Sequence, residues 1–234
     1  MTLPAPYYCE DGITIYCGDC REIMPEIAGA GLVVTDPPYS FGLASTGQEG
    51  KAGGWGDLMN NAHFYASILG EARRLISNRA GAAWVFNSWR SLPTLMRAAY
   101  EAQWPVASVL VWDKEWIGPG GSVGLRPSYE LVALFAAEGF SLDNRGIPDI
   151  RRSRWHNGMR PGLHPAEKPT ELIRWLIEES GGVGPVLDPF MGSGTTLVAA
   201  KQLGRKAVGI EIEERYCEVA VQRLAQGVLP LEAP

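Results

Sequence analysis

The chain has 234 residues, 46% of them apolar, and a net charge of −5 at pH 7. Its length suits a single α/β domain over residues 1–234, its apolar content is ample for a core, and its net charge excludes a wholly basic surface, so any nucleic-acid site has to be local. No stretch is long and apolar enough to span a membrane, and residues 1–10 lack a signal-peptide pattern, so we expect a cytoplasmic protein without a membrane partner.

Strand-like and helix-like stretches alternate along the chain. Strands are predicted over residues 12–17, 31–35, 82–86, 107–112, 130–135, 183–187 and 207–210. Helices are predicted over residues 21–27, 64–76, 92–102, 170–179, 195–203 and 213–225. A long loop is predicted over 41–59 and irregular structure over 141–163. This alternation favours an α/β fold with a doubly wound, mostly parallel seven-stranded sheet, in which 107–112 and 130–135 can pair as a hairpin.

The four cysteines are too few and too scattered for a disulfide framework. Cys17 and Cys20 match the spacing C-x-x-C, which occurs in redox and zinc sites. Neither a thioredoxin-like context nor a second pair of ligands accompanies them. We therefore predict no metal.

The strand over 31–35 runs into the sequence Asp36-Pro37-Pro38-Tyr39. Two consecutive prolines cannot continue a central strand, so the strand has to stop there. A carboxylate, a stiff turn and an aromatic ring are thereby left together at a strand end, which is the edge where open α/β sheets bind ligands. Taken alone, the motif also fits a Pro-rich turn with a solvated aspartate.

A second motif joins the strand at 183–187 to the helix at 195–203. Its glycines allow close approach of the backbone to a ligand, and the helix start offers free N–H groups to an anion. It is neither the dinucleotide fingerprint nor a P-loop. Its residues of interest are Asp188, Phe190, Gly192, Ser193, Gly194, Thr195 and Thr196.

Two further carboxylates follow strands. Glu211 stands after the strand at 207–210, where a carboxylate commonly accepts hydrogen bonds from ribose hydroxyls. Asp19 follows the strand at 12–17 and can accept from a cofactor's adenosine moiety. Considered alone, each is equally a solvated acid at a strand end or turn.

Together these motifs resemble the amino-group DNA methyltransferases, which use S-adenosyl-L-methionine. The catalytic motif precedes the cofactor motif, as in the circularly permuted β class. The segment His164-Pro165-Ala166-Glu167-Lys168-Pro169 is similar to the one that opens the helix before the cofactor loop in that class. The resemblance implies a Rossmann-like class I methyltransferase fold, permuted, with S-adenosyl-L-methionine as cofactor and double-stranded DNA as partner.

The resemblance also implies roles for individual residues. Asp36 and the carbonyl of Pro37, stiffened by Pro38, would accept hydrogen bonds from the two N–H groups of the target amine. Tyr39 would stack on the flipped-out base. His164 also fits a structural or capping role. Cofactor contacts are expected from Asp19, Asp188, Phe190, Gly192, Ser193, Gly194, Thr195, Thr196, Glu211, His164 and Lys168.

Residues 138–163 occupy the place of the target-recognition region in the family. The stretch 145–160 holds five arginines and one aspartate, hence a local charge of +4. Arginine suits phosphate contacts and guanine readout, although a solvated basic loop has the same composition. The region is short, which predicts a short recognition site or help from a second subunit in a homodimer. The candidate DNA-binding residues are Arg145, Arg151, Arg152, Arg154 and Arg160.

Aspartate at the first catalytic position favours N6 of adenine as the target, by analogy with the family. N4 of cytosine is the alternative, because a carboxylate can serve either amine. A silent DNA-binding module and an RNA or protein methyltransferase are the remaining interpretations. The resemblance implies a cytoplasmic, nucleoid-associated protein encoded by a prokaryote or a phage, and leaves its biological role open.

Overall fold

The structure is a computed structural model that describes residues 3–38, 62–76, 80–118, 124–155, 167–182 and 184–226. These residues form one nine-stranded sheet of order β1-β2-β9-β8-β3-β4-β6-β5-β7. The strands are β1 (Tyr8–Glu10), β2 (Ile13–Cys17), β3 (Leu32–Thr35), β4 (Ala82–Asn87), β5 (Val106–Asp113), β6 (Tyr129–Ala136), β7 (Ile150–Arg152), β8 (Val186–Asp188) and β9 (Ala207–Glu211).

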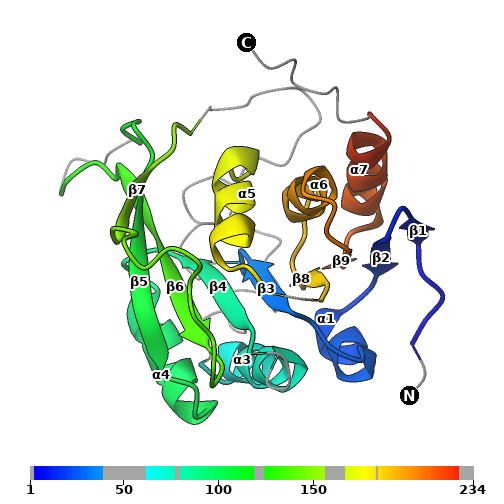
Figure 1. Ribbon diagram of the computed structural model, residues 1–234, viewed down its shortest axis with the longest axis horizontal. Helices are drawn as coiled ribbons and strands as arrows, with labels where there is room; N and C mark the ends of the chain where they lie inside the picture. Colours follow the sequence, from blue (N-terminus) through cyan, green and yellow to red (C-terminus); the bar gives the residue numbers. More distant parts are fainter. Residues whose placement is uncertain are drawn as a thin grey trace.

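Helices cover both faces of this sheet, as Figure 1 shows. On one face, α5, α6 and α7 share a hydrophobic cluster with the sheet. On the other face, α1, α3 and α4 share a second cluster with it. The helices are α1 (Cys20–Ile23), α3 (Ala62–Ile76), α4 (Leu92–Glu101), α5 (Thr170–Glu179), α6 (Thr195–Gln202) and α7 (Glu214–Ala225), with a 3-10 turn η1 (Met24–Glu26).

The central strand β3 shows why the sheet needs helices on both faces. Leu32 and Val34 belong to the cluster with α5–α7, whereas Val33 belongs to the cluster with α1, α3 and α4. Its four residues are buried, which is the pattern of a parallel strand covered on both sides. The strand ends at Thr35, so the side chain of Asp36 lies at the carboxyl edge of the sheet.

The strand directions match a doubly wound sheet with an antiparallel hairpin. Strands β2, β9, β8, β3 and β4 are parallel neighbours, and β6 is antiparallel to both β4 and β5. The chain winds outward from β8 to β9 and from β3 to β4, so the winding reverses between β3 and β8. Ligands bind at the carboxyl edge beside such a switch point.

All seven predicted strands are present, and the sheet of the described residues has two further strands that were not predicted, β1 and β7. β1 is a three-residue strand at the sheet edge, antiparallel to β2, and β7 lies in the stretch predicted to be irregular. The hydrogen bonds that define β7 come from β5, through Val111, Trp112 and Asp113. The predicted helix at 21–27 is divided into α1 and η1, with Pro25 in the first turn of η1.

Among the described residues, no helix is both long and apolar enough to cross a membrane. The predicted loop over 41–59 lies outside the described residues.

Candidate active site

Four strand ends bring the predicted carboxylates to one edge of the sheet. Asp36 follows β3, Asp188 ends β8, Glu211 ends β9, and Asp19 follows β2. Because these four strands are parallel neighbours in the order β2-β9-β8-β3, the residues follow one another along the carboxyl edge. The arrangement therefore brings together two motifs that are about 150 residues apart in the sequence.

The turn after β3 is held from α3. The hydroxyl of Tyr65 donates a hydrogen bond to the carbonyl oxygen of Pro38 over 3.0 Å. Burial of Tyr65, helped by the negative charge of Asp36, raises the pKa of its hydroxyl, which therefore stays a donor at neutral pH. In the part of the chain that the structure describes, the Oδ1 atom of Asp36 is buried and accepts no hydrogen bond.

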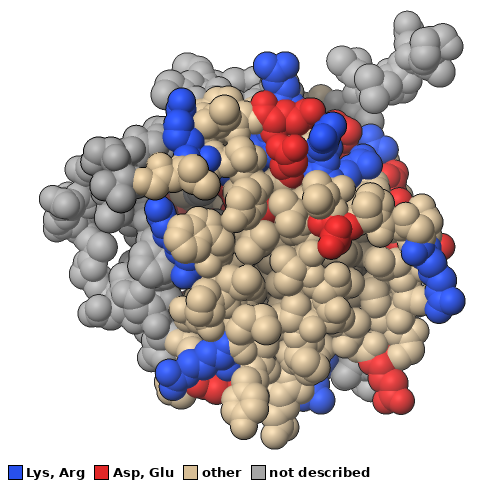
Figure 2. Space-filling view, turned by 90° about the vertical axis from the view of Figure 1, so that its left-hand side faces the viewer, with Lys and Arg blue, Asp and Glu red and all other residues tan. Residues whose placement is uncertain are grey.

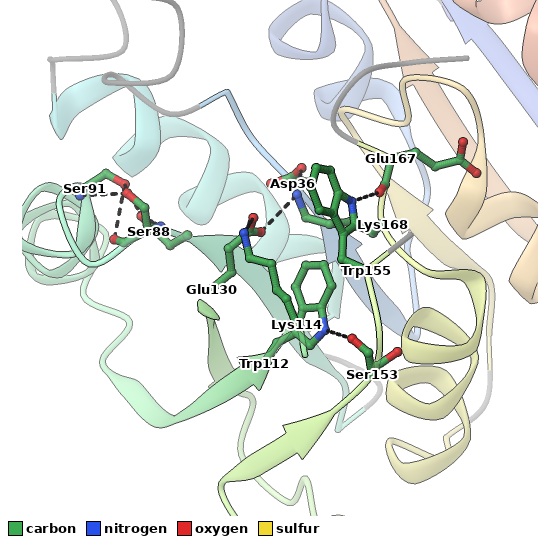
Figure 3. Close-up of polar contacts among 11 residues, drawn as sticks. Asp36, Ser88, Ser91, Trp112, Lys114, Glu130, Ser153, Trp155, Glu167 and Lys168 are labelled. Carbon is green, nitrogen blue, oxygen red and sulfur yellow. Dashed lines mark hydrogen bonds and ion pairs between the residues drawn. The ribbon is translucent and has the colours of Figure 1, made fainter. Parts of the chain in front are cut away.

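The second oxygen of Asp36 belongs to a line of alternating charges, drawn in Figure 3. Nζ of Lys168 lies 2.5 Å from Oδ2 of Asp36 and 3.2 Å from Oε2 of Glu130. Nζ of Lys114 lies 2.7 Å from Oε1 of Glu130. These residues come from the end of β3, the segment before α5, β6 and the end of β5. The sequence predicted Lys168 as a cofactor contact and did not anticipate this place for it.

Aromatic rings surround these charges. Nζ of Lys168 lies 5.3 Å from the centre of the Phe86 ring, and Nζ of Lys114 lies 5.7 Å from the rings of both Trp112 and Trp155. The indole N–H of Trp155 donates to the carbonyl of Glu167 over 3.2 Å, which links the chain after β7 to the segment that carries Lys168 (Figure 3). The rings both exclude water and favour the two ammonium groups.

Asp188 holds the glycine-rich turn together. Its carboxylate accepts from the N–H of Phe190 over 3.1 Å and from the hydroxyl of Thr196 over 2.6 Å. Burial raises the pKa of Asp188 to about 7, and the neighbouring charge of Asp36 contributes to this rise. Gly194 has a φ of +81°, and a Cβ atom there would lie 2.7 Å from Cβ of Ala220. This glycine therefore serves the close packing of the turn against α7.

An arginine that the sequence analysis missed lies behind the same turn. Nη1 of Arg223 donates to the carbonyl and hydroxyl oxygens of Ser193, over 2.8 and 2.9 Å, and to the hydroxyl of Thr195 over 3.1 Å. Nη2 of Arg223 pairs with Oε1 of Glu167 at 2.5 Å. The two hydroxyls predicted to bind a cofactor thus also tie the turn to α7. Nothing in the sequence pattern of α7 distinguishes Arg223 from a solvated residue.

Glu211 reaches from β9 to the glycine-rich turn. Its Oε2 accepts from the N–H of Gly192 over 3.0 Å, and its Oε1 accepts from the N–H of Glu213 over 2.9 Å. Burial raises the pKa of Glu211. A carboxylate in this position fits the hydroxyls of a ribose.

Asp19 is the N-cap of α1. It accepts from the backbone N–H of Arg21 over 2.9 Å and from the guanidinium of the same residue, whose hydrogen bonds lower the pKa of Asp19. The neighbouring Gly18 donates its N–H to the carbonyl of Glu211 over 2.8 Å, so Asp19 lies next to the end of β9.

The predicted DNA-binding arginines have different environments. Arg151 packs its guanidinium 4.8 Å from the ring centre of Trp175, whereas Arg145, Arg152 and Arg154 are exposed. Figure 2 shows the side that carries β5 and α4, where charged side chains lie mostly around the margins of an uncharged centre. On this face, the described lysine and arginine side chains are therefore confined mostly to the margins.

Three predicted site residues, Tyr39, Arg160 and His164, lie outside the described residues. Within the residues that the structure does describe, no group of three or more His, Cys, Asp or Glu side chains is arranged to hold a metal ion. Cys17 and Cys20 are free thiols.

Comparison with known families decides the class of the protein. Residues 30–222 match the model of the N6_N4_Mtase family, described as DNA methylase. The chain belongs to this DNA methylase family. The match includes the catalytic motif, the segment before α5, the glycine-rich turn and Glu211. The predicted resemblance to amino-group DNA methyltransferases is thereby confirmed.

Two relatives align with this DNA methylase over most of their length. The Type II methyltransferase M.ScaI of Streptomyces caespitosus is 50% identical over 271 aligned positions, covering 95% of this chain and 84% of the relative. The "Putative methylase YubD" of Escherichia coli (strain K12) is 31% identical over 213 positions, covering 89% of this chain and 88% of the relative.

Solved structures confirm the fold class. The M1.HpyAVI–SAM complex superposes with a TM-score of 0.67 at 24% identity, covering 90% of this chain and 99% of the other. The cytosine-N4-specific PvuII DNA methyltransferase superposes with a TM-score of 0.70 at 16% identity, covering 100% of this chain and 90% of the other. S-adenosyl-L-methionine, the cofactor expected from the sequence, is the ligand of one of these solved structures, the M1.HpyAVI complex.

The residues at the edge of the sheet fit that cofactor. Glu211 offers a carboxylate to ribose hydroxyls, and the first turn of α6, which has no side-chain cap within the described residues, presents N–H groups suited to a carboxylate. When bound, S-adenosyl-L-methionine supplies an electrophilic methyl group.

Proposed function

We propose that this DNA methylase transfers a methyl group to the exocyclic amino group of a flipped-out base in double-stranded DNA, with N6 of adenine as the preferred target. The observation that carries the proposal is the environment of Asp36. Its Oδ1 is buried and accepts no hydrogen bond within the described residues, while Oδ2 is bound by Lys168. One acceptor at the sheet edge therefore has no partner among the described residues, and we assign it to the amino group of the substrate, next to the strand that leads into the glycine-rich turn.

The chemistry requires such an acceptor. The lone pair of an exocyclic amine is delocalised into the ring of the base, so the nitrogen is a weak nucleophile. A carboxylate and a carbonyl that accept hydrogen bonds from its two N–H groups favour rehybridisation of the nitrogen. This frees the lone pair for in-line attack. Asp36 supplies the carboxylate, and the carbonyl of Pro37 is our candidate for the second acceptor. The mechanism forms no covalent intermediate with the enzyme.

The turn that presents these acceptors is stiff. Pro37 and Pro38 restrict its backbone, and Tyr65 fixes the carbonyl of Pro38 from α3. A preorganised turn costs little to hold in the reactive geometry, which is the main contribution that a protein can make to this reaction. Tyr39 is the candidate to stack on the flipped base.

The choice between adenine and cytosine depends on the first residue of the motif. Asp36 favours adenine by analogy with the family, as argued from the sequence. The fold itself does not separate the two bases, because a cytosine-N4-specific methyltransferase shares it. N4 of cytosine is therefore the second candidate target, with the same acceptors and the same mechanism.

The exposed arginines around β7 are the candidate DNA contacts. Residues 150–155 connect them to the active site, since the N–H of Trp155 donates to the carbonyl of Lys114 over 2.9 Å. Arg152 and Arg154 thus lie at the same edge of the sheet as Asp36. We assign residues 138–163 to target recognition, and a restriction–modification role agrees with the Type II relatives.

The class of substrate is tested by following a labelled methyl group. The purified protein is incubated with labelled S-adenosyl-L-methionine and, in separate reactions, unmethylated duplex DNA, structured RNA and a protein extract. Label in DNA alone supports the proposal. Label in RNA or protein alone, or cofactor binding without transfer to any of the three, would contradict it.

A further inference from the structure

Four charged side chains form a continuous line that leads away from the catalytic carboxylate. Asp36, Lys168, Glu130 and Lys114 alternate in sign, with successive contacts of 2.5, 3.2 and 2.7 Å. Lys168 is buried, and the side chains of Lys114 and Glu130 are 13% and 19% exposed. A buried group of charges is expensive to assemble, and replacing it by apolar side chains is often neutral or stabilising. Stability alone is thus a weak reason for this line to exist.

We propose that Lys168 is a positioning residue for methyl transfer, which binds Oδ2 of Asp36 so that Oδ1 stays directed at the target amine, and that Glu130 and Lys114 hold Lys168 in place. The inference rests on the proposed function. It assigns Lys168 to the catalytic side of the site, whereas the sequence analysis predicted that Lys168 contacts the cofactor.

The contacts explain how this works. A carboxylate with two free oxygens can rotate and offer either oxygen, whereas the ammonium of Lys168 fixes one oxygen and leaves the other. An ammonium between two carboxylates also favours their ionised forms. A protonated Asp36 would lose acceptor strength toward the amine.

Lys168 itself remains charged in this place. Burial lowers its pKa, but the carboxylates of Asp36 and Glu130 outweigh that effect and raise the pKa above its ordinary value. The pKa of Glu130 is lowered, since Lys168 and Lys114 outweigh its burial. The ring of Phe86 faces the same ammonium. The two central members of the line, Lys168 and Glu130, therefore favour each other's charged forms.

Other titratable groups also face Asp36. Tyr65 contacts the same turn from α3, and Asp188 lies at the neighbouring strand end, with Asp36 among the causes that raise the pKa of each. Neither group is positive, so among the described residues Lys168 is the cation in contact with Asp36. Replacing Lys168 by an uncharged residue therefore removes the positive charge beside the catalytic carboxylate.

The test uses Lys168→Met, which keeps the length of the side chain and removes its charge. We expect kcat for methyl transfer to fall by about 100-fold, as for a misplaced catalytic group, with the affinity for S-adenosyl-L-methionine unchanged in calorimetry. In the pH profile of the remaining kcat, the acid limb, which is the loss of activity at low pH, should move to higher pH. A merely structural lysine would lower activity without moving that limb.

Two matched variants control for charge and for folding. Lys168→Arg keeps the charge, so its acid limb should stay at the wild-type pH even if its kcat falls. Glu130→Gln leaves Asp36 and Lys168 in place but weakens the hold on the ammonium, so the limb should move less than in Lys168→Met. If Lys168→Met does not fold, the shift in Glu130→Gln decides.

The outcomes separate this inference from the proposed function. Wild-type protein that transfers no methyl group to DNA overturns the proposed function, and this inference with it. If wild-type protein is active and the acid limb of Lys168→Met lies at the wild-type pH, the inference alone is overturned. If Lys168→Met is unfolded, the same result in Glu130→Gln overturns it. Loss of cofactor affinity in Lys168→Met, with an unmoved limb, would return Lys168 to the cofactor site.

Discussion

The carboxylate of Glu211 accepts a hydrogen bond from the backbone N–H of Gly192 over 3.0 Å. This contact joins the end of β9 to the glycine-rich turn after β8, and it fixes the half-buried acid that we expect to bind a ribose. The turn that we expect to receive the amino-acid end of the cofactor and the acid that we expect to receive its sugar are thereby a single unit.

Glu211→Ala should therefore weaken cofactor binding. The variant loses charge-assisted hydrogen bonds of about 1.5–3 kcal/mol, so we expect a Kd for S-adenosyl-L-methionine about 10–100-fold higher in calorimetry. Glu213→Ala is the control, because Glu213 is exposed and pairs with Arg215. Equal affinities of Glu211→Ala and wild-type protein would show that Glu211 does not contact the cofactor.

Asp36→Ala should strongly lower turnover and leave cofactor binding intact. Loss of one preorganised acceptor costs about 10²–10³-fold in kcat in comparable sites, and steady-state transfer to DNA measures it. Asp11→Asn is a control at an exposed aspartate that pairs with Lys201. Near-normal turnover of Asp36→Ala would refute the mechanism.

The exposed arginines at the end of β7 and just after it should set the salt dependence of DNA binding. Each phosphate contact contributes about 0.9 to the slope of log K against log salt, so the double variant Arg152→Ala, Arg154→Ala should flatten the slope by up to about 2. Arg97→Ala, on the exposed side of α4, is the control. An unchanged slope would remove this segment from the DNA interface.

Gly194→Ala should destabilise the fold. The new Cβ would lie 2.7 Å from Cβ of Ala220, at a φ of +81°. Gly204→Ala is the matched control, with a φ of +66° and no atom within 4 Å of the place that its new Cβ would take. Overpacking costs about 1–3 kcal/mol, so Gly194→Ala should lose that much more free energy of unfolding than Gly204→Ala in a denaturant titration. Equal losses would contradict tight packing of the turn against α7.

Asp188 should make stability depend on pH. Burial raises its pKa from 3.8 to about 7, so the folded state binds the proton more tightly than the unfolded state. The resulting stabilisation is fully present below pH 3.8 and is lost as pH rises toward 7. Asp188→Asn should remove this dependence, and its melting temperature should fall less than that of wild-type protein between pH 5 and 8. Parallel pH profiles would contradict the buried acid.

The fold was largely predictable because its strands carry strong local patterns. The run from Leu32 to Thr35 is apolar throughout its first three residues and stops at a proline pair, so both its type and its end can be read from the sequence. β1 and β7 could not be predicted, because each has three residues, mostly exposed or half-buried, and gains its hydrogen bonds from a neighbouring strand.

The candidate site was predictable where it consists of motifs, and not where it depends on distant contacts. Asp36 and Glu211 stand at strand ends that the sequence reveals. The ion pair of Lys168 with Asp36 joins residues that are 132 positions apart, and no local pattern encodes it. Arg223 likewise meets Glu167, which precedes α5, only because α5, α6 and α7 pack together on one face of the sheet.

The most direct test of the central claim identifies the methylated nucleoside. Wild-type protein is incubated with unmethylated duplex DNA and S-adenosyl-L-methionine, and the DNA is digested to nucleosides and separated by mass spectrometry against standards. We predict N6-methyladenine in wild-type reactions and far less of it in matched reactions with Asp36→Ala. N4-methylcytosine would keep the mechanism and change the base. The absence of any methylated amine, from protein that binds the cofactor, would contradict the account.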